Sequence, residues 1–165
     1  MKKGFDIYSS SSLGNIWMVV SELGLHEIFL LEDHFNAYLK QHPELVQDEE
    51  ICLNVKRQLD EYFKGQRKHF ELTLAYEATP FRKLVWENLR KIPYGKTISY
   101  SDLAAQIGNP KAVRAVGGAN RANPIPIIVP CHRVIGKSGK LVGYMGDKTH
   151  IQEKLILHEQ AYKDK

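Results

Sequence analysis

The strongest constraint on the fold lies at residues 108–110, where Gly-Asn-Pro interrupts a helical pattern in the second half of the chain. Glycine readily ends a helix, and proline cannot continue one. Before this break, Ser99 is a predicted N-cap with Asp102 three residues on, which is the spacing of a capping box. After it, Asn-Pro is expected to cap a helix from Lys111 to about Ala119. Two short helices joined in this way are typical of a helix-turn-helix.

The same half contains three further elements. Thr79, followed by proline, is predicted to cap an amphipathic helix that ends near residues 93–95. A basic turn at 137–140 separates two short apolar runs, as the wing hairpin of a winged helix does. A last helix is expected from about Thr149 to Glu159. Residues 76–165 are therefore interpreted as a mostly α winged helix-turn-helix domain.

The first half of the chain has a different pattern. Strand-like runs separated by Ser- or Gly-containing breaks occupy Phe5–Ser10, Ile16–Ser21 and Leu25–Leu31. Apolar residues at helical spacing predict a helix over 45–63, and His69–Leu74 is a possible further strand. Residues 1–75 are therefore interpreted as a small α/β domain without a catalytic constellation.

Charge is divided unevenly between the two halves. Residues 1–75 hold 8 basic and 12 acidic side chains, a net charge of −4, whereas residues 76–165 hold 15 and 7, a net charge of +8. Within 82–140 the basic residues number 11 and the acidic ones two. This asymmetry suggests a polyanionic partner for the second half. A basic face that only meets solvent explains the charge alone equally well.

Composition limits the class of protein. The 165 residues are 43% hydrophobic and 25% charged, which is ordinary for a soluble globular protein. No apolar run approaches the roughly 18 residues that a membrane span needs, and the first residues lack an apolar signal region. The two cysteines, Cys52 and Cys131, form neither a metal motif nor a disulfide framework. A reducing, cytoplasmic location is therefore expected.

The candidate chemistry is concentrated in Pro130-Cys131-His132-Arg133. The thiolate is the reactive form of cysteine, and basic or cationic neighbours favour it. Proline restricts the backbone around it, which predicts a rigid turn for Cys131. An isolated cysteine is more often a small core residue, and Cys52 is interpreted in that way.

The predicted helix over 111–120 has little side-chain capacity to recognise bases. Arg114 is its main candidate, whereas a helix built for sequence readout carries several Arg, Asn or Gln side chains. Gly117 and Gly118 cost helix stability but permit close approach of another surface. Tight packing of this glycine-rich helix inside the protein is an equally good explanation from these residues alone.

The run from Arg114 to Pro124, followed by Pro130-Cys131-His132-Arg133-Val134, resembles the O6-alkylguanine-DNA alkyltransferases, also called methylated-DNA–protein-cysteine methyltransferases. The match is densest over 94–136, and the two-domain layout agrees over the whole chain. The resemblance implies a ribonuclease-H-like α/β domain, a small sheet plus helix, followed by the winged helix-turn-helix domain. It also implies suicide repair, in which the alkyl group of O6-alkylguanine, and of O4-alkylthymine, moves from a flipped-out base to the protein.

Roles for individual residues follow from the resemblance. Cys131 would be the alkyl acceptor, His132 would take its proton through water, and Glu159 would orient His132. Asn123 would brace the active-site turn, and Tyr100 would donate to the leaving guanine. Arg114 would be the finger that enters the base stack. The other implied DNA contacts are Gly117, Gly118, Ala119, Arg121 and Arg133, and the implied base-binding groups are Val134, Tyr144 and Met145.

The partner implied by the resemblance is alkylated double-stranded DNA, bound by a monomer in the minor groove without sequence preference. No cofactor is expected, and no zinc, because residues 1–75 hold only one cysteine, Cys52. Met145 stands where the family usually has a smaller residue, so the resemblance does not determine the width of the alkyl pocket. Three alternatives remain at this stage: a lesion-binding module that does no chemistry, a winged-helix transcription factor and a cysteine hydrolase.

Overall fold

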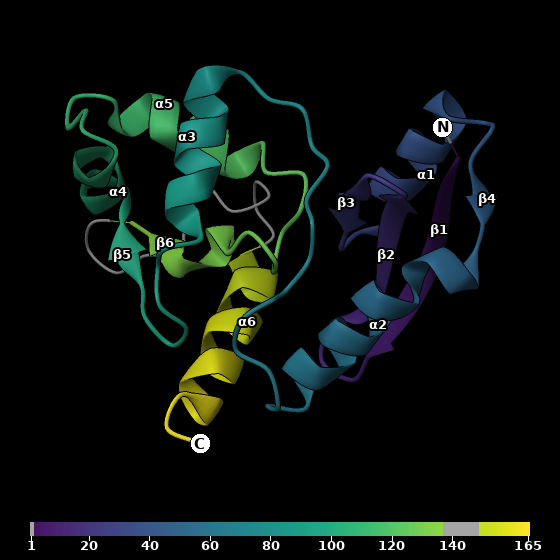
Figure 1. Cartoon of the computed structure of the whole chain (residues 1–165). Helices are drawn as coiled ribbons and strands as arrows, with labels where there is room; N and C mark the ends of the chain where they lie inside the picture. Colours follow the sequence, from purple (N-terminus) through teal and green to yellow (C-terminus); the bar gives the residue numbers. More distant parts are fainter. Residues whose placement is uncertain (1, 137–148) are drawn as a thin grey trace. The chain divides into compact units, whose positions relative to one another are not determined.

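The computed structural model describes residues 2–136 and 149–165 (Figure 1). The chain divides into two compact units, Met1–Tyr76 and Glu77–Lys165. Each unit has its own buried core, so each is described by itself. Among the described residues, no helix combines the length and the apolar character that crossing a membrane requires.

A four-stranded sheet forms the first unit, with strand order β3-β2-β1-β4. Strands β1 (Lys3–Ser10), β2 (Gly14–Ser21) and β3 (Gly24–Phe29) are antiparallel neighbours, and β4 (Val46–Gln47) pairs parallel with β1. The three long strands confirm the strands expected from the sequence, with differences of at most two residues at either end. Their alternating side chains give the sheet two faces to bury.

One helix covers each face of this sheet. Phe5 and Trp17 pack with Phe35 of α1 (Glu32–Gln41). Residues of the opposite parity contact α2 (Glu49–Phe63): Asp6 accepts a hydrogen bond from Lys56, and Tyr8 donates one to Asp60. Because successive strand residues point to opposite faces, α1 and α2 lie on the two sides of the sheet.

Three expectations for this unit need correction. The helix expected over 45–63 begins only at Glu49, because Asp48 caps it by accepting from the Ile51 N–H. Helix α1 was not expected, and its first residue follows Leu31, which supplies no side-chain cap. The run 69–74 forms no strand; Leu74 makes an isolated bridge to Leu25.

Local signals place the helices of the second unit. Thr79 caps α3 (Pro80–Leu89) by accepting from the Arg82 N–H, and Ser99 and Asp102 form the expected capping box of α4 (Tyr100–Gln106). Gly108 follows α4 with φ +84°, a conformation that favours glycine. The next helix, α5 (Val113–Arg121), starts two residues later than expected. Its N-cap is Ala112, so Asn109 and Pro110 do not cap it.

Helices α3, α4 and α5 pack around a shared apolar core, and Trp86 of α3 donates to the Ala119 carbonyl of α5 at 2.8 Å. A 3-10 turn at Cys131–Arg133 leads into β6 (Val134–Ile135), which pairs parallel with β5 (Ile98–Ser99). Helix α6 (Thr149–Tyr162) completes the unit and contacts the 3-10 turn. The fold is thus a small α/β unit followed by a mostly helical helix-turn-helix unit. The expected wing turn at 137–140 lies outside the described residues.

Candidate active site

Cys131 lies at the start of the 3-10 turn and is 4% exposed. Its N–H donates to the Val129 carbonyl at 2.8 Å, and its own carbonyl accepts from the Val134 N–H. These backbone bonds fix the residue that carries the thiol. The short turn after Pro130 is the rigid setting that the sequence predicts.

The segment that leads to Cys131 is pinned by Asn123. Its Nδ2 donates to the Val129 carbonyl at 2.8 Å, and its Oδ1 accepts from the Ile125 N–H at 3.0 Å. Between these contacts lies Ile127, whose φ of 75° is unusual for a β-branched residue. Such a conformation persists where the surrounding contacts impose it. Asn123 therefore spans and holds a strained turn directly before the cysteine.

Glu159 of α6 joins His132 and Arg133 in one buried network. Its Oε2 accepts from His132 Nε2 at 2.7 Å and from Arg133 Nη2 at 3.1 Å, while Oε1 accepts from Arg133 Nε at 2.8 Å. His132 is 0% exposed and Glu159 is 2% exposed. A charge-assisted, two-pronged contact of this kind is among the stronger and more directional in proteins.

Burial and partners set the protonation of this network. Burial lowers the pKa of His132 below its ordinary value, and the neighbouring Glu159 only partly offsets this effect. Burial by itself would raise the pKa of Glu159, but His132 and Arg133 outweigh it and hold that pKa well below the usual range. The network therefore combines a carboxylate with a neutral imidazole at neutral pH.

The carboxylate also selects the tautomer of the imidazole. A neutral His132 must carry its hydrogen on Nε2 in order to donate to Glu159, which leaves the Nδ1 lone pair as an acceptor. This Nδ1 is buried and has no hydrogen-bond partner among the described residues. The arrangement presents a base whose orientation a third group fixes.

Arg133 does not have the position expected of a DNA contact. It is 6% exposed, and its Nη1 donates a hydrogen bond to the Ile92 carbonyl at 2.7 Å. With its guanidinium held by Glu159 and Ile92, it cannot reach a phosphate without breaking the network. The sequence showed its charge but not its burial, and the DNA role is withdrawn.

Tyr100 begins α4 and is partly buried beside the cysteine. Its hydroxyl oxygen lies 3.5 Å from Nδ2 of Asn120, and the same Nδ2 lies 3.4 Å from the Cys131 carbonyl oxygen. Burial raises the pKa of Tyr100, the Asn120 contact lowers it, and the charge of Cys131 raises it. Tyr100 is therefore a protonated phenol, able to donate, near the nucleophile.

The expected base-binding groups are only partly described. Val134 is buried in β6, its N–H donates to the Cys131 carbonyl, and its own carbonyl accepts from Gln152 Nε2 at 2.8 Å. The same Gln152 amide donates to the His132 carbonyl at 3.2 Å. Tyr144 and Met145 lie outside the described residues.

The outer surface of α5 is basic and open. Arg114 and Arg121 are exposed. A Cβ built on Gly118 would meet nothing within 4 Å, and one on Gly117 would only touch the Tyr100 ring at 4.0 Å. Internal crowding thus does not explain the two glycines. Ala119 is 3% exposed and faces the core, so its expected DNA contact is corrected.

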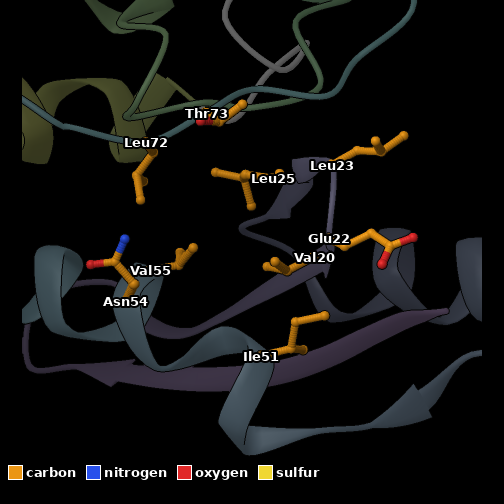
Figure 2. Close-up of a pocket in the computed structure, with 10 residues that line it drawn as sticks. Val20, Glu22, Leu23, Leu25, Ile51, Asn54, Val55, Leu72 and Thr73 are labelled. Carbon is orange, nitrogen blue, oxygen red and sulfur yellow. The ribbon is translucent and has the colours of Figure 1, made fainter. Parts of the chain in front are cut away.

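A metal site and a ligand-binding cavity are the two other kinds of site to consider in this structure. Over the described ranges 2–136 and 149–165, no group of three or more metal-ligating side chains comes together. A cavity of about 230 Å³ lies in the first unit between the β2–β3 turn and α2 (Figure 2). Val20, Leu25 and Val55 line much of it, with Glu22, Asn54 and Thr73 as its polar members, so neither a cysteine nor a histidine lines it.

Three functional contacts escaped the sequence analysis. Asn120 belongs to the run 114–124 but received no role there. Gln152 received no role either, and the ion pair between Arg133 and Glu159 was not expected. The pattern on α6 offered a signal, because Gln152 and Glu159 flank Leu155 on one helical face at spacings of three and four residues. Asn120 offered none, since its partners come from two other elements.

Comparison with known proteins identifies the domains. A family model described as the DNA binding domain of 6-O-methylguanine DNA methyltransferase matches residues 80–161. A second, described as the ribonuclease-like domain of 6-O-methylguanine DNA methyltransferase, matches residues 5–76. Together they cover most of both units.

Individual relatives agree. The constitutive methylated-DNA–protein-cysteine methyltransferase of Bacillus subtilis is 43% identical over 95% of this chain and 96% of that protein. The crystal structure of the Mycobacterium tuberculosis O6-methylguanine methyltransferase superposes with a TM-score of 0.87 at 38% identity, covering 97% of this chain and 94% of the other. A structure of the M. tuberculosis protein in complex with DNA gives a TM-score of 0.84 at 36% identity, with coverage of 98% and 94%.

Proposed function

Because this chain belongs to the 6-O-methylguanine DNA methyltransferase family, we propose that it repairs DNA by transferring the alkyl group of O6-alkylguanine to its own Cys131. The observation that carries the proposal is the buried His132–Glu159 pair, with Nε2 and Oε2 2.7 Å apart. Its imidazole belongs to the residue directly after that cysteine. A thiol next to an oriented neutral base can be converted into a nucleophile. A module that only binds lesions needs no reactive cysteine.

The first step is activation of the thiol. The Cys131 proton passes through a water molecule to Nδ1 of His132, because Nε2 already carries the hydrogen donated to Glu159. The imidazolium that forms is stabilised by the Glu159 carboxylate, as in other nucleophile–base–acid arrangements. Arg133 keeps this carboxylate ionised and oriented.

The second step is displacement at the alkyl carbon. The thiolate sulfur forms a bond to that carbon while the bond from carbon to O6 of guanine breaks. The electron pair stays on the guanine, which must be neutralised by a proton or a strong hydrogen bond. Tyr100, a protonated phenol beside the site, is the proposed donor.

The product limits the protein to one turnover. Cys131 becomes a thioether, and neither water nor a nearby side chain has a ready route to displace a thiolate from it. The protein therefore acts as a stoichiometric acceptor. The same displacement at O4-alkylthymine is chemically equivalent, and we include that lesion in the proposal.

DNA must deliver the base to a buried nucleophile. Since Cys131 is 4% exposed, a base inside a duplex cannot reach it and has to be flipped out. The open glycine surface of α5 supports close approach to the minor groove, and the exposed Arg114 of the same helix would fill the vacated stack. Contacts from Arg114 and Arg121 to phosphates would carry no sequence information. We also propose the cytoplasm as the location, since the reaction needs a reduced thiol and access to DNA.

The test is a stoichiometry experiment. The protein is incubated with excess duplex DNA carrying one labelled O6-methylguanine, and label on the protein is measured over time. Transfer should reach a plateau at about one methyl group per active molecule, in keeping with a single activated thiol. Sustained turnover, or tight lesion binding without transfer, would contradict the proposal.

A further inference from the structure

Asn120 is a buried polar residue that no step above uses. It lies in the last turn of α5 and is 1% exposed. Its side-chain amide contacts the Tyr100 hydroxyl, at the start of α4, and the Cys131 carbonyl, at the start of the 3-10 turn. It therefore connects the proposed proton donor with the backbone of the nucleophile.

The orientation of this amide follows from its partners. The carbonyl of Cys131 can only accept, so the amide nitrogen, not the oxygen, must face it. The same nitrogen also lies 3.5 Å from the Tyr100 oxygen. Asn120 is thus the donor in both contacts, and Tyr100 does not use its own hydrogen on Asn120.

Folding alone gives little reason for an amide here. Both contacts are long, at 3.4 and 3.5 Å, and the Cys131 carbonyl also accepts from the Val134 N–H. The Asn120 Oδ1 is buried and has no hydrogen-bond partner among the described residues. A buried oxygen in this state costs stability, typically about 1–3 kcal/mol. An apolar side chain of similar volume would avoid that cost.

We propose that Asn120 is a positioning residue that holds the Tyr100 hydroxyl as an acceptor, so that its proton is directed to the departing guanine. The inference rests on the function proposed above. Donation to the phenol oxygen also makes Tyr100 a better acid, because it opposes the burial and the Cys131 charge that raise the pKa of Tyr100. Contacts that are long without substrate can tighten when the lesion is bound.

The central experiment is a double-mutant cycle on single-turnover transfer from methylated duplex DNA. Asn120→Leu should slow transfer about five- to tenfold, the factor that one hydrogen bond of ordinary strength provides. Tyr100→Phe should slow it at least as much. If Asn120 acts through Tyr100, adding Asn120→Leu to Tyr100→Phe should change the rate by less than about twofold.

A second variant supplies a pH readout. Asn120→Asp keeps the size, but its ionised carboxylate would accept the Tyr100 proton and draw it away from the guanine. The ratio of the variant rate to the wild-type rate should therefore fall as pH rises and the new carboxyl ionises. A purely structural contact would give a ratio that does not follow pH in this direction.

Asn88→Leu is the matched control. Asn88 is another buried asparagine of the same unit, 5% exposed, but it bonds to Leu84 and Gln106, neither of which has a role in the proposed reaction. It should affect the melting temperature more than the transfer rate, whereas Asn120→Leu should do the reverse.

Two results would overturn the inference. One is an Asn120→Leu rate equal to wild type, and the other is a full multiplicative loss in the Tyr100→Phe background. Either leaves the proposed function intact as long as the wild-type protein transfers one methyl group to Cys131. Failure of the proposed function would instead appear as no transfer by the wild-type protein.

Discussion

Each unit of this protein holds a buried cysteine and an acidic residue that is at least partly buried, and the surroundings of the two pairs have opposite effects on ionisation. In the first unit, burial raises the pKa of Glu27 to about 7, and the charge of Lys3 offsets this only in part. Burial also raises the pKa of Cys52 to about 12, with Asp6 and Asp48 adding to the effect. In the second unit, Glu159 is held as a carboxylate by His132 and Arg133. Burial alone favours the neutral form of a carboxyl or a thiol, whereas hydrogen-bond donors and cations around the group favour the ionised form.

The comparison has a consequence for reactivity. Cys52 is fully buried among groups that oppose its ionisation, so it serves as a small core residue of α2. Cys131 is also buried, but it precedes a neutral imidazole with an acceptor nitrogen. Under the proposed function, the two cysteines would therefore differ in reactivity because of their partners and not because of their exposure.

The largest expected difference is between the two cysteines. Cys131→Ala should abolish methyl transfer while DNA binding remains, because only the acceptor atom is lost. Cys52→Ala should transfer at the wild-type rate, with some loss of stability from a small cavity. Peptide mass analysis of the reacted wild-type protein should locate the added methyl on Cys131. Methyl found on Cys52 would break the contrast.

Glu159→Gln should have the next largest effect. Loss of the carboxylate removes the group that stabilises the imidazolium, and transfer should slow by about 10²- to 10⁴-fold, as for the corresponding change in other triads. The pH profile of Cys131 alkylation by a small reagent should move to higher pH. An unchanged profile would assign Glu159 to structure alone.

The same change should also destabilise the fold, because it leaves Arg133 buried without its counter-charge. Removing one partner of a buried ion pair typically costs about 3–5 kcal/mol. Transfer should therefore be measured well below the melting temperature of the variant. Restoring much of the stability by adding Arg133→Met, without restoring transfer, would separate the two roles of Glu159.

Local signals in the sequence predicted much of the second unit and less of the first. Thr79, Ser99 with Asp102, and Gly108 act through their own backbone neighbours, so their effect can be deduced without the fold. Helix α1 lacks such a cap and was missed. The run 69–74 was taken for a strand because its pattern gives no sign that only Leu74 would find a partner.

In the site, too, local features could be predicted from the sequence and tertiary contacts could not. Cys131 and His132 adjoin in the sequence and were identified there, whereas Glu159 came only from family resemblance. The DNA role of Arg133 also came from the resemblance, and nothing in the sequence revealed that its side chain is buried. Asn120 was overlooked because its partners, Tyr100 and Cys131, are 20 and 11 residues away in the chain. Contacts made by tertiary convergence lie beyond what periodicity and spacing can predict.

A pair of arginines gives a smaller test of the same contrast between buried and exposed charge. Arg114→Ala removes an exposed cation, so it should weaken DNA binding, lower its salt dependence, and slow repair in duplex DNA more than reaction with free O6-benzylguanine. Arg133→Met should leave the salt dependence of binding unchanged. Equal losses of Arg114→Ala on both substrates would contradict its role in the stack.

The smallest effect on stability is expected at Glu27, because Lys3 offsets only part of the cost of burying its carboxylate. Between about pH 4.5 and 7 the unfolded chain loses this proton while the folded chain keeps it, so wild-type stability falls as pH rises through that window. Glu27→Gln does not ionise. It should therefore gain stability over wild type from pH 5 to pH 8, by about 1 kcal/mol after allowance for its partial exposure.

The measurement is thermal unfolding of both proteins at several pH values, with Glu22→Gln as a control for loss of one exposed charge. Glu159→Gln should show the opposite sign, because its wild-type pKa is depressed: its deficit is complete at pH 7 and shrinks as pH falls below the ordinary range of a carboxyl. One partly buried and one fully buried carboxyl of the same chain should thus respond to pH in opposite directions. If Glu27→Gln instead loses stability as pH rises, a partner must hold Glu27 ionised, and the contrast between the two units would fail at that residue.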